Sequence, residues 1–144
     1  MSTYVMSDIH GDYPKYQQSL KAICLQENDV LYVLGDVVDR GTGSCKILLD
    51  MMCHFNIIPI LGNHEFMAIS VLSKLVEEIT EDTLVGFDQN FLMGMLTWFK
   101  NGGRNTLAEF KKLSPEDRQS ILEYLEEFEL YAETTVNGQE YVLV

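Results

Sequence analysis

Residues 30–41 read Val-Leu-Tyr-Val-Leu-Gly-Asp-Val-Val-Asp-Arg-Gly. The apolar run Val30–Leu34 predicts a buried strand, and Gly35 permits the tight turn that ends it. Two carboxylates and an arginine follow the turn, at Asp36, Asp39 and Arg40. In open α/β sheets, ligands bind beyond the carboxyl ends of the strands. The stretch therefore predicts an α/β fold with a binding site directly after one of its strands.

The same strand-and-turn pattern occurs on both sides of this stretch. Tyr4–Met6 precedes Ser7-Asp8-Ile9-His10-Gly11, and Ile57–Leu61 precedes Gly62-Asn63-His64-Glu65. Apolar residues at helical spacing follow each turn, and Asp12 can cap the first of these helices. The alternation of strands and helices predicts a largely parallel sheet. If the three strands are neighbours, the polar residues that follow them meet at one edge.

The second half of the chain predicts helices and one hairpin. One helix ends at the break Asn101-Gly102-Gly103, and a later helix has a capped start at Ser114. Tyr131–Val136 and Gln139–Val144, joined by Asn137-Gly138, predict a β-hairpin. Because no repeat, low-complexity stretch or linker interrupts the chain, we expect one domain over residues 1–144.

Composition restricts the classes of partner and the compartment. The formal net charge of −12 argues against nucleic acid, because phosphate backbones need clustered Lys and Arg. No apolar run approaches the roughly 18–20 residues that cross a bilayer, and the strand-like N-terminus leaves no room for a signal peptide. Cys24, Cys45 and Cys53 lack metal-binding spacing and are expected to be buried free thiols. Together these features predict a cytoplasmic protein without a membrane partner.

Residues that can bind metal follow every predicted strand: Asp8 and His10, Asp36 and Asp39, and Asn63 and His64. Taken singly, an Asp-x-His pair after a strand is more often a helix cap with a surface histidine. Three independent accidents would not all supply Asp, His or Asn at the same topological position. The combined set therefore indicates a metal site at one edge of the sheet.

The ordered motifs Ser7–Gly11, Gly35–Gly41 and Gly62–Glu65 resemble those of the calcineurin-like metallophosphoesterases. Within that group the resemblance is to bacterial members of the phosphoprotein phosphatase family, whose motifs are Gly-Asp-x-His-Gly, Gly-Asp-x-Val-Asp-Arg-Gly and Gly-Asn-His-Glu. It is strong from Tyr4 to Met67 and weaker beyond. It implies the N-terminal part of a β-sandwich flanked by helices, an αββα arrangement, with a helical insertion.

The resemblance implies a centre with two divalent ions. Asp8, His10 and Asp36 would bind the first ion, and Asp36 would bridge to a second ion that also takes the oxygen of Asn63. Ligands of mixed oxygen and imidazole type suit manganese, iron or zinc. Two ions about 3.5–4 Å apart can activate a bridging water for in-line attack on phosphorus.

The same resemblance implies roles around the phosphate. His64 would be the general acid that protonates the leaving oxygen, with Asp39 holding its ring. Arg40 would bind the phosphate in a fork, and Asn63 would also contact it. Glu65 would be structural, bonding within the first turn of its helix. Arg104 is expected to be a solvent-exposed arginine, with a phosphate contact as the alternative.

Two departures from the family pattern bear on the substrate. Ser7 stands where the pattern has Gly, which is a small change. Leu61 stands where many eukaryotic members have arginine, and it is similar to the residue in bacterial diadenosine tetraphosphatases. Those enzymes usually have Asp at the position of Glu65 and tend to lack the full Asp-Arg-Gly. We therefore expect hydrolysis of phosphomonoesters such as phosphoserine or phosphothreonine, with a dinucleoside polyphosphate as the alternative substrate.

The family completes its second metal site with two histidines from later motifs. The chain contains only one further histidine, His54, which is expected at a helix end away from the site. We therefore expect a truncated sequence that is inactive alone and self-associates through the exposed sheet near Val142 and Val144. A fragment that acts only as a folded or partner-binding domain is the alternative to an enzyme.

Overall fold

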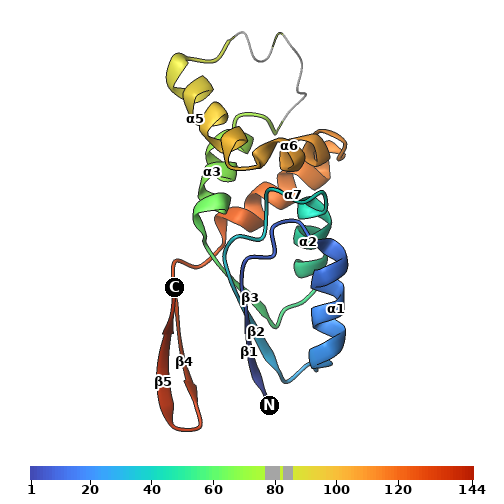
Figure 1. Cartoon of the computed structure of the whole chain (residues 1–144), viewed down its shortest axis with the longest axis vertical. Helices are drawn as coiled ribbons and strands as arrows, with labels where there is room; N and C mark the ends of the chain where they lie inside the picture. The colour runs from blue at the N-terminus through green and yellow to red at the C-terminus, as the bar shows by residue number, and fades with distance from the viewer. Residues whose placement is uncertain (77–81, 83–85) are drawn as a thin grey trace.

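The computed structural model describes residues 1–76, 82 and 86–144. The described helices and strands are, in chain order, β1 (Thr3–Met6), α1 (Tyr13–Ile23), β2 (Val30–Leu34), α2 (Ser44–Met51), β3 (Ile57–Ile60), α3 (Asn63–Leu72), α5 (Gln89–Lys100), α6 (Gly103–Lys111), α7 (Pro115–Glu126), β4 (Ala132–Val136) and β5 (Gln139–Leu143). This order confirms the α/β class, with α5–α7 as the helical insertion between the third and fourth strands (Figure 1).

The first three strands form one parallel sheet in the order β1-β2-β3. Met6 pairs with Val33, and Leu34 pairs with Ile60, so the carboxyl ends of the three strands lie level with one another. The prediction that the three motif loops meet at one edge is therefore confirmed. A backbone bridge beside Ile60 extends this sheet, because Glu129 accepts the N–H of Leu61 at 2.7 Å.

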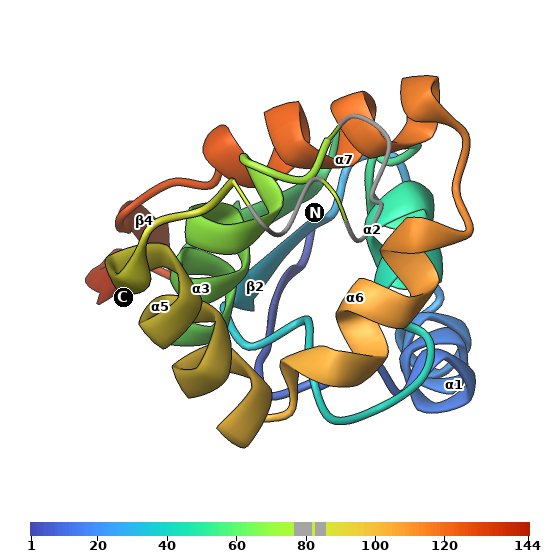
Figure 2. The same cartoon turned by 90° about the horizontal axis from the view of Figure 1, so that it is seen from above.

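The sheet and the helices share one apolar core. Leu31 and Val33 of β2 are almost completely buried and belong to the same cluster as Leu48 of α2 and Ile121 of α7. Seen from above, α7 runs beside both α2 and α3, against which it packs (Figure 2). Trp98 of α5 is the largest of the fully buried side chains. This packing ties the C-terminal helices to the elements that carry the three motifs.

Local signals in the sequence account for the ends of several elements. Asp12 caps α1 by accepting the N–H of Lys15 at 3.1 Å, and Ser114 caps α7 by accepting that of Asp117 at 3.2 Å. β4 and β5 form the predicted antiparallel hairpin as a separate sheet. Its turn at residues 137–138 has positive φ at both positions, as a tight Asn-Gly hairpin requires.

The prediction of three buried thiols is wrong for two cysteines. Cys45 is buried within α2, and this burial raises the pKa of its thiol. Cys24 and Cys53 are exposed. Both lie just past the end of a helix, α1 or α2, where the chain turns and the apolar face of the helix no longer meets the core. None of the described helices is long and apolar enough to cross a membrane.

Candidate active site

The loops after β1 and β2 have an unusual backbone. Asp8, His10, Asp36, Asp39 and Arg40 all have φ between 45° and 76°, in the left-handed region that residues other than glycine seldom adopt. Such conformations persist only where the surrounding structure imposes them, and they concentrate at functional sites. Every one of these five residues belongs to the predicted site.

Backbone hydrogen bonds between the two loops hold these conformations. His10 N–H donates to the carbonyl of Asp36 at 2.9 Å, and Gly11 N–H donates to that of Val37 at 2.8 Å. In the opposite direction, Gly41 N–H donates to the carbonyl oxygen of His10 at 2.9 Å. A Cβ atom at Gly41 would lie 2.4 Å from that carbonyl oxygen, so the close approach of the loops requires glycine there.

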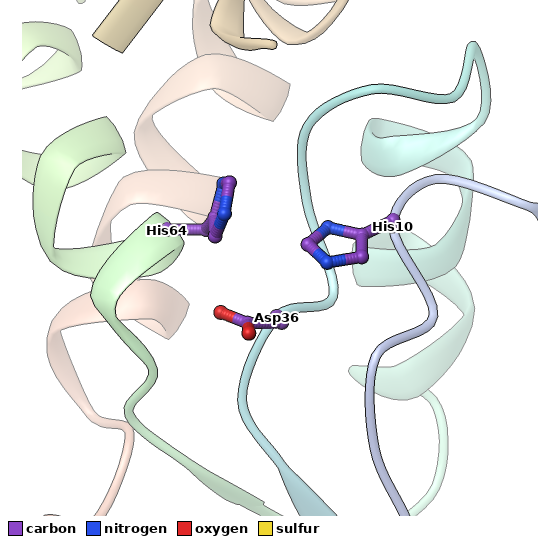
Figure 3. Close-up of side chains that lie close together, drawn as sticks. All are labelled: His10, Asp36 and His64. Atoms are coloured by element: carbon purple, nitrogen blue, oxygen red, sulfur yellow. The ribbon is translucent and has the colours of Figure 1, made fainter. Parts of the chain in front are cut away.

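Three predicted site residues converge at the carboxyl edge of the sheet. His10, Asp36 and His64 come from the three motif loops, and their potential ligand atoms all lie within 4.8 Å of one another (Figure 3). The two imidazole rings meet edge to face, with centroids 4.7 Å apart. Among the described residues, this is the one group of His, Cys, Asp and Glu side chains with metal-binding geometry.

Hydrogen bonds at the far side of each ring leave the other nitrogen available. His10 Nδ1 lies 3.0 Å from the carbonyl oxygen of Val38, and His64 Nδ1 lies 2.8 Å from Asp39 Oδ2. The carbonyl oxygen of Val38 and the carboxylate of Asp39 are both hydrogen-bond acceptors. Each Nδ1 is therefore expected to carry the ring proton. Nε2 of each ring then keeps a lone pair for a metal ion or can carry a second proton.

The residues present fit a metal ion. Asp36 Oδ1 is buried in the cluster, and no protein group in the described chain bonds to it. A buried carboxylate oxygen without a partner is costly unless a cation or a donor satisfies it. Imidazole nitrogen and carboxylate oxygen are suitable ligands for manganese, iron or zinc.

The other predicted ligands lie beside the cluster on its exposed side. Asp8 is exposed, with Oδ1 3.9 Å from His10 Nε2, and Ser7 donates a hydrogen bond of 2.7 Å to its other oxygen. Asn63 is the first residue of α3 and is also exposed. The cluster of His10 and Asp36 thus includes His64 in place of Asp8.

Arg40 and Arg104 are the two candidates for phosphate binding, and their contacts differ. Arg40 is exposed, and within the described part of the chain it pairs with no carboxylate. Arg104 is also exposed but stacks on the ring of Phe99, with its guanidinium carbon 4.6 Å from the centroid. His54 lies near Asp50 at the end of α2, away from the motif loops as expected.

The contact between Asp39 and His64 involves two further residues that the motifs do not contain. Asp39 is completely buried, and its Oδ2 accepts both His64 Nδ1 and Trp98 Nε1, each at 2.8 Å. Its Oδ1 accepts the hydroxyl of Thr106 at 2.7 Å. Sequence reasoning missed Trp98 and Thr106. The one available signal was the position of Trp98, the single tryptophan, three residues before the Asn101-Gly102-Gly103 break.

Glu65 has a larger structural role than the predicted bond within its own helix. Its side chain is fully buried and accepts the N–H groups of Gly62 at 3.1 Å and of Val37 and Val38 in the second motif loop. Burial raises the pKa of the Glu65 carboxyl, while these backbone hydrogen bonds oppose the shift. The side chain thereby joins the third motif to the second.

A parallel sheet with histidine and aspartate clustered at its carboxyl edge is an arrangement suited to metal-assisted hydrolysis. The sequence profile of the family described as Calcineurin-like phosphoesterase matches residues 1–143. The chain therefore belongs to the calcineurin-like phosphoesterase family, a family of hydrolases, as the motifs predicted.

The named relatives are bacterial symmetrical bis(5′-nucleosyl)-tetraphosphatases. The protein of Wigglesworthia glossinidia brevipalpis is 36% identical over 86 residues, which is 58% of this chain and 32% of the relative. That of Erwinia tasmaniensis is 30% identical over 116 residues, which is 78% of this chain and 42% of the relative. That of Haemophilus ducreyi is 38% identical over 74 residues, which is 50% of this chain and 27% of the relative. The chain spans about a third of the length of the curated relatives it matches.

Proposed function

We propose that this protein takes part in the hydrolysis of bis(5′-nucleosyl) tetraphosphates at the central phosphoanhydride bond, releasing two nucleoside diphosphates. The observation that carries this proposal is the name shared by the three relatives described above, symmetrical bis(5′-nucleosyl)-tetraphosphatase. Leu61 in place of arginine supports the same substrate class. The net charge of −12 also favours a small phosphate compound brought in with a metal ion over a nucleic acid.

The metal-binding role falls to His10 and Asp36, with Asp8 and Asn63 at the exposed side of the same edge. A bound divalent ion would polarise a phosphoryl oxygen and lower the pKa of a water molecule. The unpartnered oxygen of Asp36 and the available Nε2 of His10 are the groups that support this assignment.

The phosphate-handling role falls to His64 and Arg40. With its Nδ1 proton held by Asp39, His64 can donate a second proton from Nε2 to the departing oxygen. Arg40 is an exposed cation beside this pair, and its planar guanidinium matches two phosphate oxygens. Because nucleoside diphosphates are weakly basic leaving groups, this substrate places a smaller demand on His64 than a serine alkoxide does.

A second candidate function is hydrolysis of phosphomonoesters in the manner of serine/threonine phosphatases. Two features favour it: the complete Asp39-Arg40-Gly41 sequence of the second motif and Glu65 at the end of the third. We rank it below the tetraphosphatase because the three relatives described above are symmetrical tetraphosphatases.

Product analysis distinguishes the two candidates. A chain extended through the later motifs of the family is incubated with Mn²⁺ and either bis(5′-adenosyl) tetraphosphate or a phosphoserine peptide, with the same chain carrying His10→Ala as the blank. We expect ADP as the sole nucleotide product by anion-exchange chromatography. Formation of AMP and ATP would contradict symmetrical cleavage. Turnover of the peptide together with an untouched tetraphosphate would favour the second candidate instead.

A further inference from the structure

Residues 98–106, named here the clamp segment, contact the active-site turn from a distant part of the chain. The segment runs from the end of α5 into the first turns of α6. Trp98 and Thr106 lie 59 and 67 positions from Asp39, to which both side chains bond. The turn that they contact contains Asp39 and Arg40, both in the left-handed conformation.

The clamp segment fixes the side chain of Asp39 at both oxygens. Trp98 Nε1 donates to Oδ2 at 2.8 Å, and Thr106 Oγ1 donates to Oδ1 at 2.7 Å. Rotation of the carboxylate about its Cβ–Cγ bond would break both hydrogen bonds at once. Oδ2 is also the atom that His64 Nδ1 contacts. The orientation of Asp39 toward His64 is therefore set by residues on two other helices.

The clamp segment also holds the backbone of the same turn. Gly102 accepts the N–H of Arg40 at 3.0 Å, and the Asn105 side chain donates to the carbonyl oxygen of Arg40 at 2.6 Å. Asp39 N–H donates to Thr106 Oγ1 at 3.0 Å, so this hydroxyl both accepts from and donates to Asp39. These hydrogen bonds explain how two consecutive residues, Asp39 and Arg40, are held in the left-handed conformation.

We propose that Trp98 and Thr106 are positioning residues that keep the proton of the neutral His64 ring on Nδ1 and its Nε2 toward His10 and Asp36. A carboxylate fixed by two buried donors presents one oxygen to the imidazole, which selects a single tautomer and ring orientation. The placement of the ring is derived from geometry alone. Its consequence for catalysis rests on the role proposed for His64 in phosphoanhydride hydrolysis.

A role in core packing alone does not explain these contacts. Trp98 is fully buried, as a core residue would be, but its indole N–H is directed at a carboxylate and not at a helix carbonyl. Thr106 is equally buried, and its hydroxyl accepts from the N–H of Asp39 and donates to its Oδ1, with Ser44 Oγ as a more distant partner at 3.3 Å. Buried donors that converge on one carboxylate from separate elements indicate orientation of that group.

The test follows the His64 ring by NMR in the metal-free protein, with ¹⁵N-labelled histidine and long-range ¹H–¹⁵N correlations. We expect the Nδ1–H tautomer and slow solvent exchange of this proton in the wild type. Thr106→Val removes one donor with little change of shape, and Trp98→Phe removes the other donor together with part of a buried ring. In both variants the proton should exchange about tenfold faster, because a hydrogen bond to a charged group is lost. The ring nitrogen shifts should also move toward a tautomer average.

Two controls separate positioning from loss of stability. Thr106→Ser keeps the hydroxyl and should restore slow exchange, whereas Phe110→Leu removes buried volume in α6 without touching Asp39 and should leave the tautomer unchanged. An Nδ1–H proton unaffected in both Trp98→Phe and Thr106→Val would overturn the proposal. Equal acceleration in Phe110→Leu would also overturn it.

Kinetics provide a second, independent test, with a phosphoserine peptide as the probe, because its alkoxide leaving group depends most on a proton from His64. A positioning role predicts that Trp98→Phe and Thr106→Val each lower kcat with KM nearly unchanged, and that Thr106→Ser, which keeps the hydroxyl, stays close to the wild type. A rise in KM alone would count against positioning. The NMR measurement uses neither metal nor substrate. A fixed His64 ring in a protein that leaves the tetraphosphate intact would therefore reject the proposed function and retain the positioning role.

Discussion

Glu65 Oε2 lies 2.8 Å from the backbone nitrogen of Asp36, so the helix after β3 holds the loop after β2 through a buried carboxylate. The carboxylate of the same Asp36 takes part in the candidate metal cluster. Glu65 of the third motif thus holds the backbone of Asp36, a candidate metal ligand in the second motif.

The substitution Glu65→Gln tests this connection. Each carboxylate oxygen of Glu65 accepts two backbone N–H groups, so the amide nitrogen of the glutamine would face two donors in either orientation. Unsatisfied buried donors cost about 1–3 kcal/mol each, and we expect the free energy of unfolding to fall by about 3 kcal/mol. Urea denaturation measures the change. Glu126→Gln on the exposed side of α7 is the matched control, and an equally small effect of both substitutions would contradict the assigned role.

Thermal unfolding with added Mn²⁺ tests the metal site without any assay of turnover. An ion at about 100 times its dissociation constant stabilises the folded protein by about 2.7 kcal/mol. We expect a clear rise of Tm in the wild type and its loss in His10→Ala and Asp36→Asn. His54→Ala removes a histidine outside the cluster and should retain the shift. Retention of the shift in both cluster variants would place the ion elsewhere.

Much of the fold could be predicted because its signals are local. The run Val30–Leu34, the cap at Asp12 and the Asn137-Gly138 turn each depend on neighbouring residues and appear as predicted. Convergence of the motif loops required one added inference, that strands joined by single helices are neighbours in a parallel sheet. The exposure of Cys24 was missed because a residue just past a helix end no longer follows the helical period.

The site could be predicted only as far as its motifs extend. Asp39 and His64 lie in recognisable motifs 25 positions apart, and their contact was expected. Trp98 and Thr106 reach the same carboxylate from helices whose packing angle no local pattern records. Their apolar or neutral side chains fit a helical core equally well, so periodicity could not separate the two roles.

The dependence of activity on the leaving group tests the role of His64. His64→Asn should reduce hydrolysis of a phosphoserine peptide about 10²–10⁴-fold, because a serine alkoxide needs a proton to depart. Cleavage of bis(5′-adenosyl) tetraphosphate should fall much less, since a terminal phosphate has a pKa near 6 and leaves without help. The Mn²⁺-induced rise of Tm should persist. Equal losses on both substrates together with loss of that rise would make His64 a metal ligand.

The pH dependence of stability should contain a contribution from Glu109. Burial raises the pKa of this carboxyl from 4.5 to about 7, and its Oε2 accepts the N–H of Ser44 at 3.0 Å. Between pH 4.5 and about pH 7, Glu109 keeps its proton in the folded protein and loses it in the unfolded chain. The contribution of Glu109 to stability is therefore complete below pH 4.5 and is lost as the pH rises through about 7.

Glu109→Gln removes this contribution. Relative to the wild type, the variant should gain about 1 kcal/mol in the free energy of unfolding between pH 5 and pH 8, after allowance for the partial exposure of the side chain. Urea denaturation at the two pH values measures the difference. Glu126→Gln, at an exposed position, should run parallel to the wild type. Parallel curves for Glu109→Gln as well would contradict the raised pKa.

Gly103 of the clamp segment packs directly against the ring of Trp98 and leaves no space for a side chain. A Cβ atom there would lie 2.4 Å from two atoms of the Trp98 ring, well inside van der Waals contact. Gly103→Ala must therefore displace the indole whose N–H bonds to Asp39. Overpacking of this kind costs typically 1–3 kcal/mol, and we expect a loss of about 2 kcal/mol in the free energy of unfolding.

Gly94→Ala on α5 provides the matched control, because a Cβ atom there would have no neighbour within 4 Å. Alanine is favoured over glycine inside helices by about 0.8–1.0 kcal/mol, so this variant should be more stable than the wild type. The same substitution at two glycines nine positions apart is thus expected to change stability in opposite directions. A Gly103→Ala variant that is as stable as Gly94→Ala would show that the indole has room to move, and the contact between Trp98 and Asp39 could then not depend on Gly103.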